Sequence, residues 1–245
     1  MSVKTLKGDD RLPIYQRLAD TLMMEITNGQ RRPGDRVPSE NGLAEDYGIS
    51  TGTARQAVAE LVDRKVLERF HGKGTFVRRP NFDQSLFRFF RFRSNTGEAI
   101  IPQSRILKRT IEPAPSYVAT RLEIEEGAEA INMSRLRLVD NEPLLAEEIW
   151  LPVTLFREFF DMPAEDIGDL LYPIYDNACN QLIAQAEEDL TVEMASPEIR
   201  RLLRLNEPTP LIVLERLAKS YSGQPLEWRR SRGTAEQFRY KTQIR

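Results

Sequence analysis

The chain of 245 residues is poor in histidine and cysteine, with one residue of each, His71 and Cys179. A single cysteine excludes a disulfide framework within the chain and fits a reducing compartment. With one histidine, the second half of the chain cannot assemble a Ser-His-Asp triad, a Cys-His pair or a histidine-rich metal site. We therefore expect no catalytic residues, no bound metal and no other cofactor.

Long hydrophobic runs are also missing. No stretch approaches the length that a membrane-spanning helix needs, and residues 1–10 lack the apolar core of a signal peptide. We therefore expect a cytoplasmic protein without a membrane partner. The composition, 40% hydrophobic and 29% charged, is that of an ordinary globular protein long enough for one or two domains.

The net charge of −2 is small but unevenly distributed. Residues 1–80 contain 14 Lys and Arg against 11 Asp and Glu, giving +3, whereas residues 81–245 contain 21 against 26, giving −5. Neutralising phosphates requires local positive charge and not a basic whole chain. The first third of the chain is therefore the part that suits nucleic acid.

Residues 35–78 carry an ordered series of helix signals. Ser39 suits the N-cap of a short helix, and Gly48 suits its C-cap, where a positive φ is needed. Ser50 or Thr51 then caps a second helix that runs to about Arg64. The second helix has an apolar stripe at helical spacing and a polar outer face.

A hairpin follows the two helices. Residues 66–70 and 75–78 alternate as strands, and the turn between them, residues 71–74, is rich in glycine and basic side chains. A small helical domain with a solvated hairpin is the alternative, but the whole series favours a winged helix-turn-helix that binds DNA. The residues expected to contact DNA are Ser39, Asn41, Thr51, Gly52, Thr53, Arg55, Gln56, His71, Gly72 and Lys73.

Residues 12–79 resemble the DNA-binding domain of the GntR family of bacterial transcription regulators. The resemblance is carried by Leu12 to Gln16, Pro33-Gly34-Asp35, Pro38-Ser39-Glu40, Leu43-Ala44 and Gly74 to Val77. It implies that Arg55 contacts DNA bases and that Thr53 contacts a phosphate. Family members often have arginine where this chain has Asn41 and Thr51, which implies an altered operator preference.

The chain changes character after a short linker. We expect a DNA-binding domain over residues 10–79, a linker over residues 80–85 and a second domain over residues 86–245. Predicted strands cover residues 87–92, 104–110, 130–139, 143–151, 210–221 and 225–232, and predicted helices or turns cover residues 116–122, 153–160, 167–178 and 197–203. Antiparallel hairpins with interspersed helices indicate an α+β domain.

This second part resembles the UTRA effector-binding domain of the HutC subfamily over about residues 86–242. The matching positions are Arg135 to Asp140, Glu142-Pro143, Ala146-Glu147, Leu151-Pro152, Leu171-Tyr172, Glu207-Pro208, Leu211, and Arg232-Gly233 before Phe238-Arg239-Tyr240. The resemblance implies a chorismate-lyase-like fold, a pocket for a small metabolite and dimerisation through this domain. Members commonly continue Arg-Gly-Asp, whereas this chain has Thr234 after Arg232-Gly233 and runs two residues longer.

Four charged residues of this domain suggest a ligand site. Arg135 and Arg137 are two apart on a strand and so share one face, where two guanidinium groups could bind a phosphate or carboxylate. Glu147 and Glu227 could accept hydrogen bonds from hydroxyls or an amine. An exposed lattice of paired charges on the sheet is the alternative. The expected effector-binding residues are Arg135, Arg137, Glu147, Glu227, Ser94, Tyr172 and Arg232, of which the first three match ligand-contacting positions in sugar-phosphate-sensing relatives.

These features together predict a homodimeric transcription regulator, more often a repressor than an activator in this arrangement. Its partners would be double-stranded operator DNA of palindromic sequence and a small phosphorylated or carboxylated metabolite that releases it. Two alternatives stay open: a chorismate-lyase-like enzyme activity in the second domain, and a DNA-binding protein without an effector.

Overall fold

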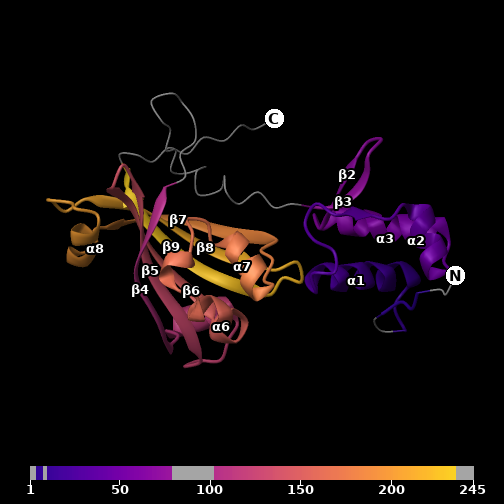
Figure 1. Ribbon diagram of the computed structural model, residues 1–245, viewed down its shortest axis with the longest axis horizontal. Helices are drawn as coiled ribbons and strands as arrows, with labels where there is room; N and C mark the ends of the chain where they lie inside the picture. The colour runs from indigo at the N-terminus through magenta and orange to yellow at the C-terminus, as the bar shows by residue number, and fades with distance from the viewer. Residues whose placement is uncertain (1–3, 8–9, 79–101, 236–245) are drawn as a thin grey trace. The chain divides into compact units, whose positions relative to one another are not determined.

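The computed structural model describes residues 4–7, 10–78 and 102–235. The chain divides into two compact units, residues 1–80 and 81–245, which are drawn together in Figure 1. The predicted strand at residues 87–92, the linker at residues 80–85 and the expected site residue Ser94 lie outside the described residues.

The first unit is a three-helix domain with a small sheet of order β1-β3-β2. Its elements are α1 (Ile14–Thr27), β1 (Arg36–Val37), α2 (Glu40–Tyr47), α3 (Thr51–Asp63), β2 (Leu67–Phe70) and β3 (Gly74–Val77). The helices meet through fully buried leucines, among them Leu22, Leu43 and Leu61. This is a winged helix-turn-helix fold, as the sequence predicts.

The helix boundaries follow from the capping residues. The Ser39 hydroxyl accepts a hydrogen bond from the Gly42 amide at 3.1 Å, and Gly48 closes α2 with a φ of 63°. Ser50 caps α3 by accepting from the Thr53 amide at 3.1 Å. These bonds satisfy amides that have no partner inside the helix, which fixes the residue at which each helix begins.

The structure adds one strand to the prediction and moves one boundary. Strand β1 pairs with β3, Arg36 opposite Phe76, although two residues are too short for a sequence pattern to reveal. Gly74 belongs to β3 and pairs with Phe70, so the wing turn is shorter than predicted.

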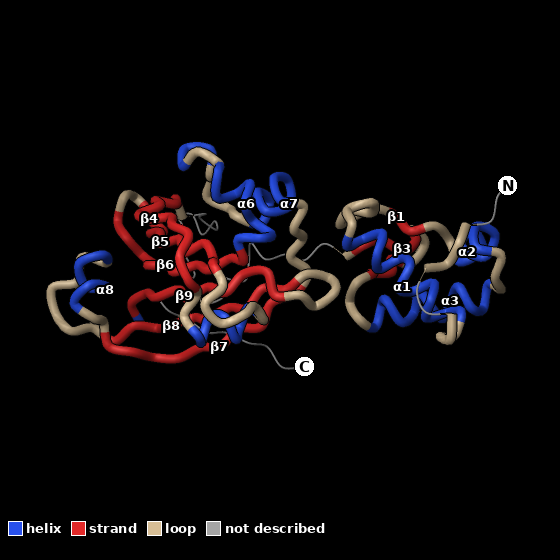
Figure 2. The backbone as a smooth tube through the Cα atoms, turned by 90° about the horizontal axis from the view of Figure 1, so that it is seen from below, coloured by secondary structure: helices blue, strands red, loops and turns tan. Residues whose placement is uncertain are grey.

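The second unit is built on a six-stranded antiparallel sheet of order β4-β5-β6-β9-β8-β7, and the labels follow this order across Figure 2. The strands are β4 (Gln103–Pro113), β5 (Glu129–Val139), β6 (Glu142–Pro152), β7 (Gln185–Met194), β8 (Pro210–Lys219) and β9 (Pro225–Thr234). Asp140 and Asn141, with φ of 50° and 64°, form the tight turn from β5 to β6.

The helices of the second unit cover the two faces of this sheet. They are α5 (Ser116–Leu122), α6 (Val153–Asp161), α7 (Tyr172–Cys179) and α8 (Pro197–Leu202), with a short 3-10 turn at Ala164–Asp166. Helices α6 and α7 lie together on one side of the sheet (Figure 2) and pack on Ile131 and Met133 of β5. Helices α5 and α8 pack on the opposite face, where Ala130 and Leu136 point. The fold is therefore α+β, as predicted.

Two elements of this unit differ from the prediction. The sequence does not predict strand β7, because its acidic residues Glu187, Glu188, Asp189 and Glu193 give it little hydrophobic character. The strand forms by pairing all ten of its residues with β8. Residues 167–178, predicted as a helix or a turn, contain a helix that begins at Tyr172, because Pro173 lacks an amide proton and is tolerated only in a first turn.

Candidate functional sites: a DNA-facing surface and a buried arginine cluster

The predicted DNA-contacting residues of the first unit lie on its surface. Arg55 and Gln56 are exposed on the outer face of α3, opposite the buried Ala54, Ala57 and Val58. The structure leaves Ser39, Asn41, Gly52, His71, Gly72 and Lys73 exposed and Thr51 and Thr53 partly exposed. Because Ser39 and Thr53 also take part in helix capping, only part of their hydrogen-bonding capacity remains for DNA.

One carboxylate connects the helices to the wing. Glu40, the first residue of α2, accepts from Arg55 Nε at 2.9 Å and from Arg69 Nη2 at 2.8 Å. Arg55 comes from α3 and Arg69 from β2, so the contacts join three elements. Sequence analysis missed Glu40, since nothing in its spacing indicates two arginine partners 15 and 29 residues away.

The tip of the wing is shaped by Gly72. Its φ of 73° lies in the left-handed region, and a Cβ added there would meet no atom within 4 Å. The flanking strands are held together by an edge-to-face contact of Phe70 and Phe76, with ring centroids 5.7 Å apart. The tip is therefore a fixed, narrow turn whose backbone can approach a partner closely.

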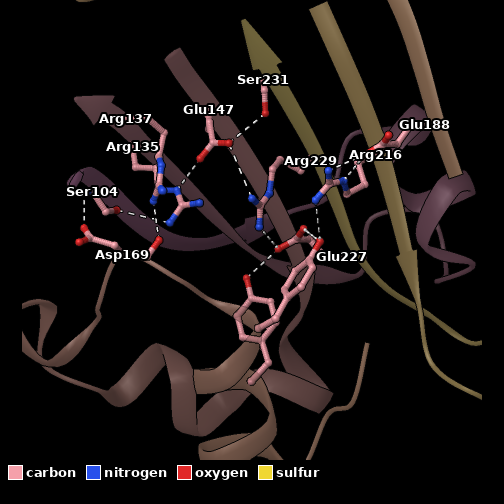
Figure 3. A network of polar contacts seen from close by, with 12 residues as sticks. Ser104, Arg135, Arg137, Glu147, Asp169, Glu188, Arg216, Glu227, Arg229 and Ser231 are labelled. Atoms are coloured by element: carbon pink, nitrogen blue, oxygen red, sulfur yellow. Dashed lines mark hydrogen bonds and ion pairs between the residues drawn. The ribbon is translucent and has the colours of Figure 1, made fainter. Parts of the chain in front are cut away.

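The second unit gathers charged side chains on the α6/α7 side of the sheet (Figure 3). Arg135 and Glu147 stand opposite each other on β5 and β6, and Arg135 Nε donates to Glu147 Oε2 at 2.6 Å. Ser231, opposite Glu147 on β9, donates to Glu147 Oε1 at 3.0 Å. Arg135 and Glu147 are 2% and 3% exposed, which overturns the alternative of an exposed charge lattice for this pair.

The cluster continues across the sheet to α7 through Arg229. Its Nη1 lies 3.7 Å from Glu147 Oε1, and its Nη2 donates to Glu227 Oε2 at 2.7 Å. Glu227 also accepts from the hydroxyls of Tyr175 at 2.8 Å and Tyr172 at 3.2 Å. A continuous buried path of ion pairs and hydrogen bonds thus links β5 to α7 (Figure 3).

The ionisation states of this path follow from burial and from the neighbouring charges. Burial alone would raise the pKa of Glu147, but Arg135, Arg229 and Arg137 outweigh it and lower this pKa to about 2. Burial, with Glu227 as the next cause, raises the pKa of Tyr175 well above its usual value. At neutral pH Glu147 is therefore an anion, and Tyr175 keeps the proton that it donates to Glu227.

Arg137 differs from the other arginines of the cluster. It is 4% exposed and donates to the backbone carbonyl of Asp169, yet no described carboxylate lies within ion-pair distance. Burial, and after it the neighbouring Arg135, lowers the pKa of Arg137 to about 10, so it remains a cation at neutral pH. Arg229 Nε is also buried without an acceptor among the described residues. The cluster therefore contains a buried donor without an acceptor, and a cation on which Glu147 and Asp169 act only from beyond ion-pair distance.

Asp169 closes the cluster from the segment before α7. Its carboxylate accepts from the Ser104 amide on β4 at 2.5 Å, and the Ser104 hydroxyl lies 3.4 Å from Arg135 Nη1. The segment is thus tied to both β4 and β5. Asp169 is itself exposed, so this is the side on which the arginines approach the surface.

The structure brings most predicted effector-site residues together and separates one. The buried path includes Arg135, Arg137, Glu147 and Glu227 (Figure 3). Tyr172 joins it by donating to Glu227. Arg232 does not: it follows Ser231 on β9 and so points to the opposite face, where it pairs with Glu193 at 2.7 Å and approaches Glu148 at 3.7 Å. Arg232 therefore lies apart from the buried path, and its place in the effector site stays a prediction.

Sequence analysis overlooked further members of the path. Arg229 and Ser231 follow Glu227 at steps of two on β9, so strand alternation alone would have placed them on one face with it. Arg216 of β8, which pairs with Glu188 at 2.5 Å, could not be found in this way. The same holds for Asp169, because its contribution is a backbone carbonyl from an irregular segment.

Opposite this cluster, the α5/α8 side of the sheet holds an open hollow of about 530 Å³. Its polar lining includes Asn132, Ser134, Glu148, Glu193 and Arg232, and also Arg135 and Glu147 of the cluster. This side carries the lattice of partly exposed charge pairs that the sequence left as an alternative. The lattice simply occupies the other set of alternating positions on the same strands.

The described residues contain no group of three or more His, Cys, Asp and Glu side chains that could hold a metal ion. No helix in the described part of the chain is long and apolar enough to cross a membrane.

Comparisons with known proteins match both units. Residues 98–239 match the UTRA domain, and residues 14–77 match the bacterial regulatory proteins of the gntR family. The chain is 26% identical over 231 residues to the mannosyl-D-glycerate transport/metabolism system repressor MngR of Escherichia coli, covering 93% of this chain and 94% of that protein. It is also 26% identical over 221 residues to the transcriptional repressor NagR of Bacillus subtilis, covering 90% of each.

A solved structure shares the fold over nearly the full length. PhnF from Mycobacterium smegmatis superposes with a TM-score of 0.55 at 19% identity, covering 95% of this chain and 99% of that one. The UTRA match alone spans more than half of the chain, and the relatives MngR and NagR are transcriptional repressors. The chain therefore belongs to the GntR family of bacterial transcription regulators, with a DNA-binding winged helix-turn-helix followed by a UTRA effector-binding domain.

Proposed function

We propose that this regulator is a homodimeric repressor of a catabolic operon, and that a small hydroxylated anion releases it from a palindromic operator. In this proposal residues 10–79 read DNA, residues 80–85 link the domains, and residues 86–245 bind the effector and dimerise. A protein of this kind acts where the chromosome lies, in the cytoplasm.

The observation that carries the effector proposal is Arg137, a buried cation with no described carboxylate within ion-pair distance. A buried charge without a close counter-charge costs several kcal/mol. A phosphate or carboxylate placed against Arg137 and Arg135 would supply that counter-charge and accept two parallel hydrogen bonds from a guanidinium group. The site thus has more to gain from an anion than from a neutral ligand.

The surrounding groups favour hydroxyls on the same ligand. Glu147, Glu227 and the two tyrosines offer acceptors and donors within reach of the arginines. A sugar phosphate or sugar acid combines both features. The name of the relative MngR points the same way, because mannosyl-D-glycerate carries a carboxylate beside sugar hydroxyls.

Ligand entry would also move the chain. Nη1 of Arg137 donates to the Asp169 carbonyl, so an anion that takes the place of that acceptor displaces the segment that leads into α7. A metabolite that binds only the displaced arrangement shifts the protein toward it. Release of the operator then follows if that arrangement holds the two DNA-binding domains at the wrong spacing.

The dimer and the palindrome follow from the size of one DNA-reading unit. A single recognition helix and wing cover only a half-site, and two-fold symmetry pairs half-sites about one helical turn apart. Light scattering should give a dimer for the full chain. Binding stoichiometry should be two chains to each duplex.

Thermal unfolding with a matched ligand series tests the effector class. Glucose, glucose 6-phosphate and glucuronate share a ring and differ in the anionic group. We expect one or both anions at millimolar concentration to raise the melting temperature and neutral glucose to leave it unchanged. If a wider set of sugar phosphates, sugar acids and other organic acids also leaves it unchanged, the protein has no anionic effector. Turnover of any of these compounds would instead indicate an enzyme.

A further inference from the structure

Glu40 occupies an unusual place for an acidic residue. Its side chain is 25% exposed on the surface that also carries Arg55 and Arg69, whose side chains are 66% and 50% exposed. A carboxylate on a DNA-facing surface repels phosphates and so lowers affinity for any duplex. Exposed ion pairs of this kind also add little to folding stability. Neither general DNA affinity nor stability therefore accounts for it.

The atoms that Glu40 uses are informative. Its Oε2 accepts from Nε of Arg55, which leaves both terminal nitrogens of that guanidinium unbound by Glu40. The terminal nitrogens are the pair that donates in parallel to O6 and N7 of guanine in the major groove. A carboxylate at Nε thus restricts rotation of the side chain and keeps its reading edge free.

The second contact extends the restraint to the wing. Oε1 of Glu40 accepts from Nη2 of Arg69 on β2, so Nε and Nη1 of Arg69 remain available for a backbone phosphate. The Glu40 carboxylate therefore restrains the distance between Arg55, which would read a base, and strand β2 of the wing. Holding both in advance lowers the entropy lost when DNA binds.

We propose that Glu40 is a positioning residue for sequence readout, which orients Arg55 for guanine and couples the wing to the recognition helix. The inference rests on the proposed DNA-reading role of Arg55. Glu40 lowers the affinity for every duplex and increases the difference in affinity between the operator and other sequences.

The test compares two duplexes at fixed salt by fluorescence anisotropy with the full chain. One is a duplex that the wild-type protein selects from a random library, and the other is a shuffled duplex of the same composition. Glu40→Gln keeps the shape but has one acceptor oxygen instead of two, and Glu40→Ala has none. We expect both variants to lower the ratio of specific to non-specific affinity by about tenfold or more, the scale of one bidentate guanine contact. Affinity for the shuffled duplex should stay equal or rise.

Glu45→Gln is the matched control, because Glu45 is exposed on the same helix and has no ion pair among the described residues. It should leave the ratio unchanged. A ratio that also stays at the wild-type value in Glu40→Ala would overturn the proposal. So would equal losses on both duplexes accompanied by a lower melting temperature, since that pattern marks a structural role.

Arg55→Ala separates this inference from the function on which it rests. Alanine has no donor for guanine, so the ratio should fall, and adding Glu40→Gln should then cost nothing more. If Arg55→Ala itself leaves the ratio intact, the DNA-reading role of Arg55 is wrong. If Arg55→Ala lowers the ratio and Glu40→Gln does not, only the positioning role fails.

Discussion

Glu147 and Arg137 lie on the same face of the sheet but differ in what surrounds them. Glu147 has Arg135 at 2.6 Å and Arg229 at 3.7 Å, whereas Arg137 has no described carboxylate partner. The two residues should therefore respond in opposite ways to removal of their charge. Replacing one member of a buried ion pair leaves the other charge buried without its partner, which lowers the stability of the fold. Replacing a buried cation that has no close carboxylate instead removes an unfavourable charge.

Glu147→Gln should destabilise the second unit by about 3–5 kcal/mol at pH 7, because Arg135 would stay buried without its counter-charge. The pKa of Glu147 is lowered to about 2 in the folded chain, so its contribution is present above its ordinary value of 4.5 and is lost as pH falls from there toward 2. Urea unfolding at pH 7 and at pH 3 measures both effects, and the variant should lose less on acidification than the wild type.

The control for that measurement is Glu148→Gln, the next residue on β6, which points to the other face with its side chain 26% exposed. It should change the free energy of unfolding by no more than about 1 kcal/mol. Equal losses in the two variants would show that Glu147 does not depend on its buried arginines.

Arg55→Ala should weaken binding to the selected duplex by about 1–3 kcal/mol if Arg55 makes a bidentate contact with guanine. Arg64→Ala serves as the control, since Arg64 is exposed at the end of the same helix and pairs with Glu60. A gel-shift titration at fixed salt measures both. Unchanged affinity in Arg55→Ala, or the same loss in Arg64→Ala, would remove Arg55 from the reading surface.

At the scale of elements, the wing is the part most sensitive to a small change. Gly72→Asn should reduce operator affinity about tenfold or more, because asparagine adopts the φ of 73° but adds a side chain at the tip. The melting temperature should change little, since an added Cβ meets no atom within 4 Å. Operator affinity equal to that of the wild type would mean that the tip does not touch DNA.

The sequence predicted elements best where local signals are strong. Ser39, Gly48 and Ser50 place α2 and α3 almost to the residue, because capping chemistry acts within one turn. Strand β7 escaped prediction because an acidic edge strand is formed by pairing with β8 and not by its own composition. Elements whose stability comes from a neighbour cannot be read from their own residues.

The candidate site shows the same division. Strand alternation placed Arg135 and Arg137 on one face, and the register of β5 with β6 brought Glu147 opposite Arg135. The same rule, applied to β9, would have rejected Arg232 and selected Arg229. The acceptor of Arg137, a backbone carbonyl in an irregular segment, has no signature in the sequence.

At the scale of the whole molecule, the chain joins a DNA-binding unit to an effector-binding domain whose sheet buries a cluster of arginines. The two functions occupy separate units, residues 1–80 and 81–245, so a change in the arginine cluster should leave DNA binding intact. Arg137 is a better probe than Arg135, because replacing Arg135 would also strip Glu147 of its closest partner.

The most direct measurement is release of the selected duplex by the anion that raises the melting temperature of the wild type, followed by fluorescence anisotropy. Arg137→Met keeps the length of the side chain, and it should bind the duplex and dimerise like the wild type, with equal or higher stability. Arg105→Met, which changes an exposed arginine of β4, is the control and should respond like the wild type. We expect Arg137→Met to stay on DNA at anion concentrations that release the wild type and the control, whereas its release at the wild-type concentration would show that Arg137 does not bind the effector.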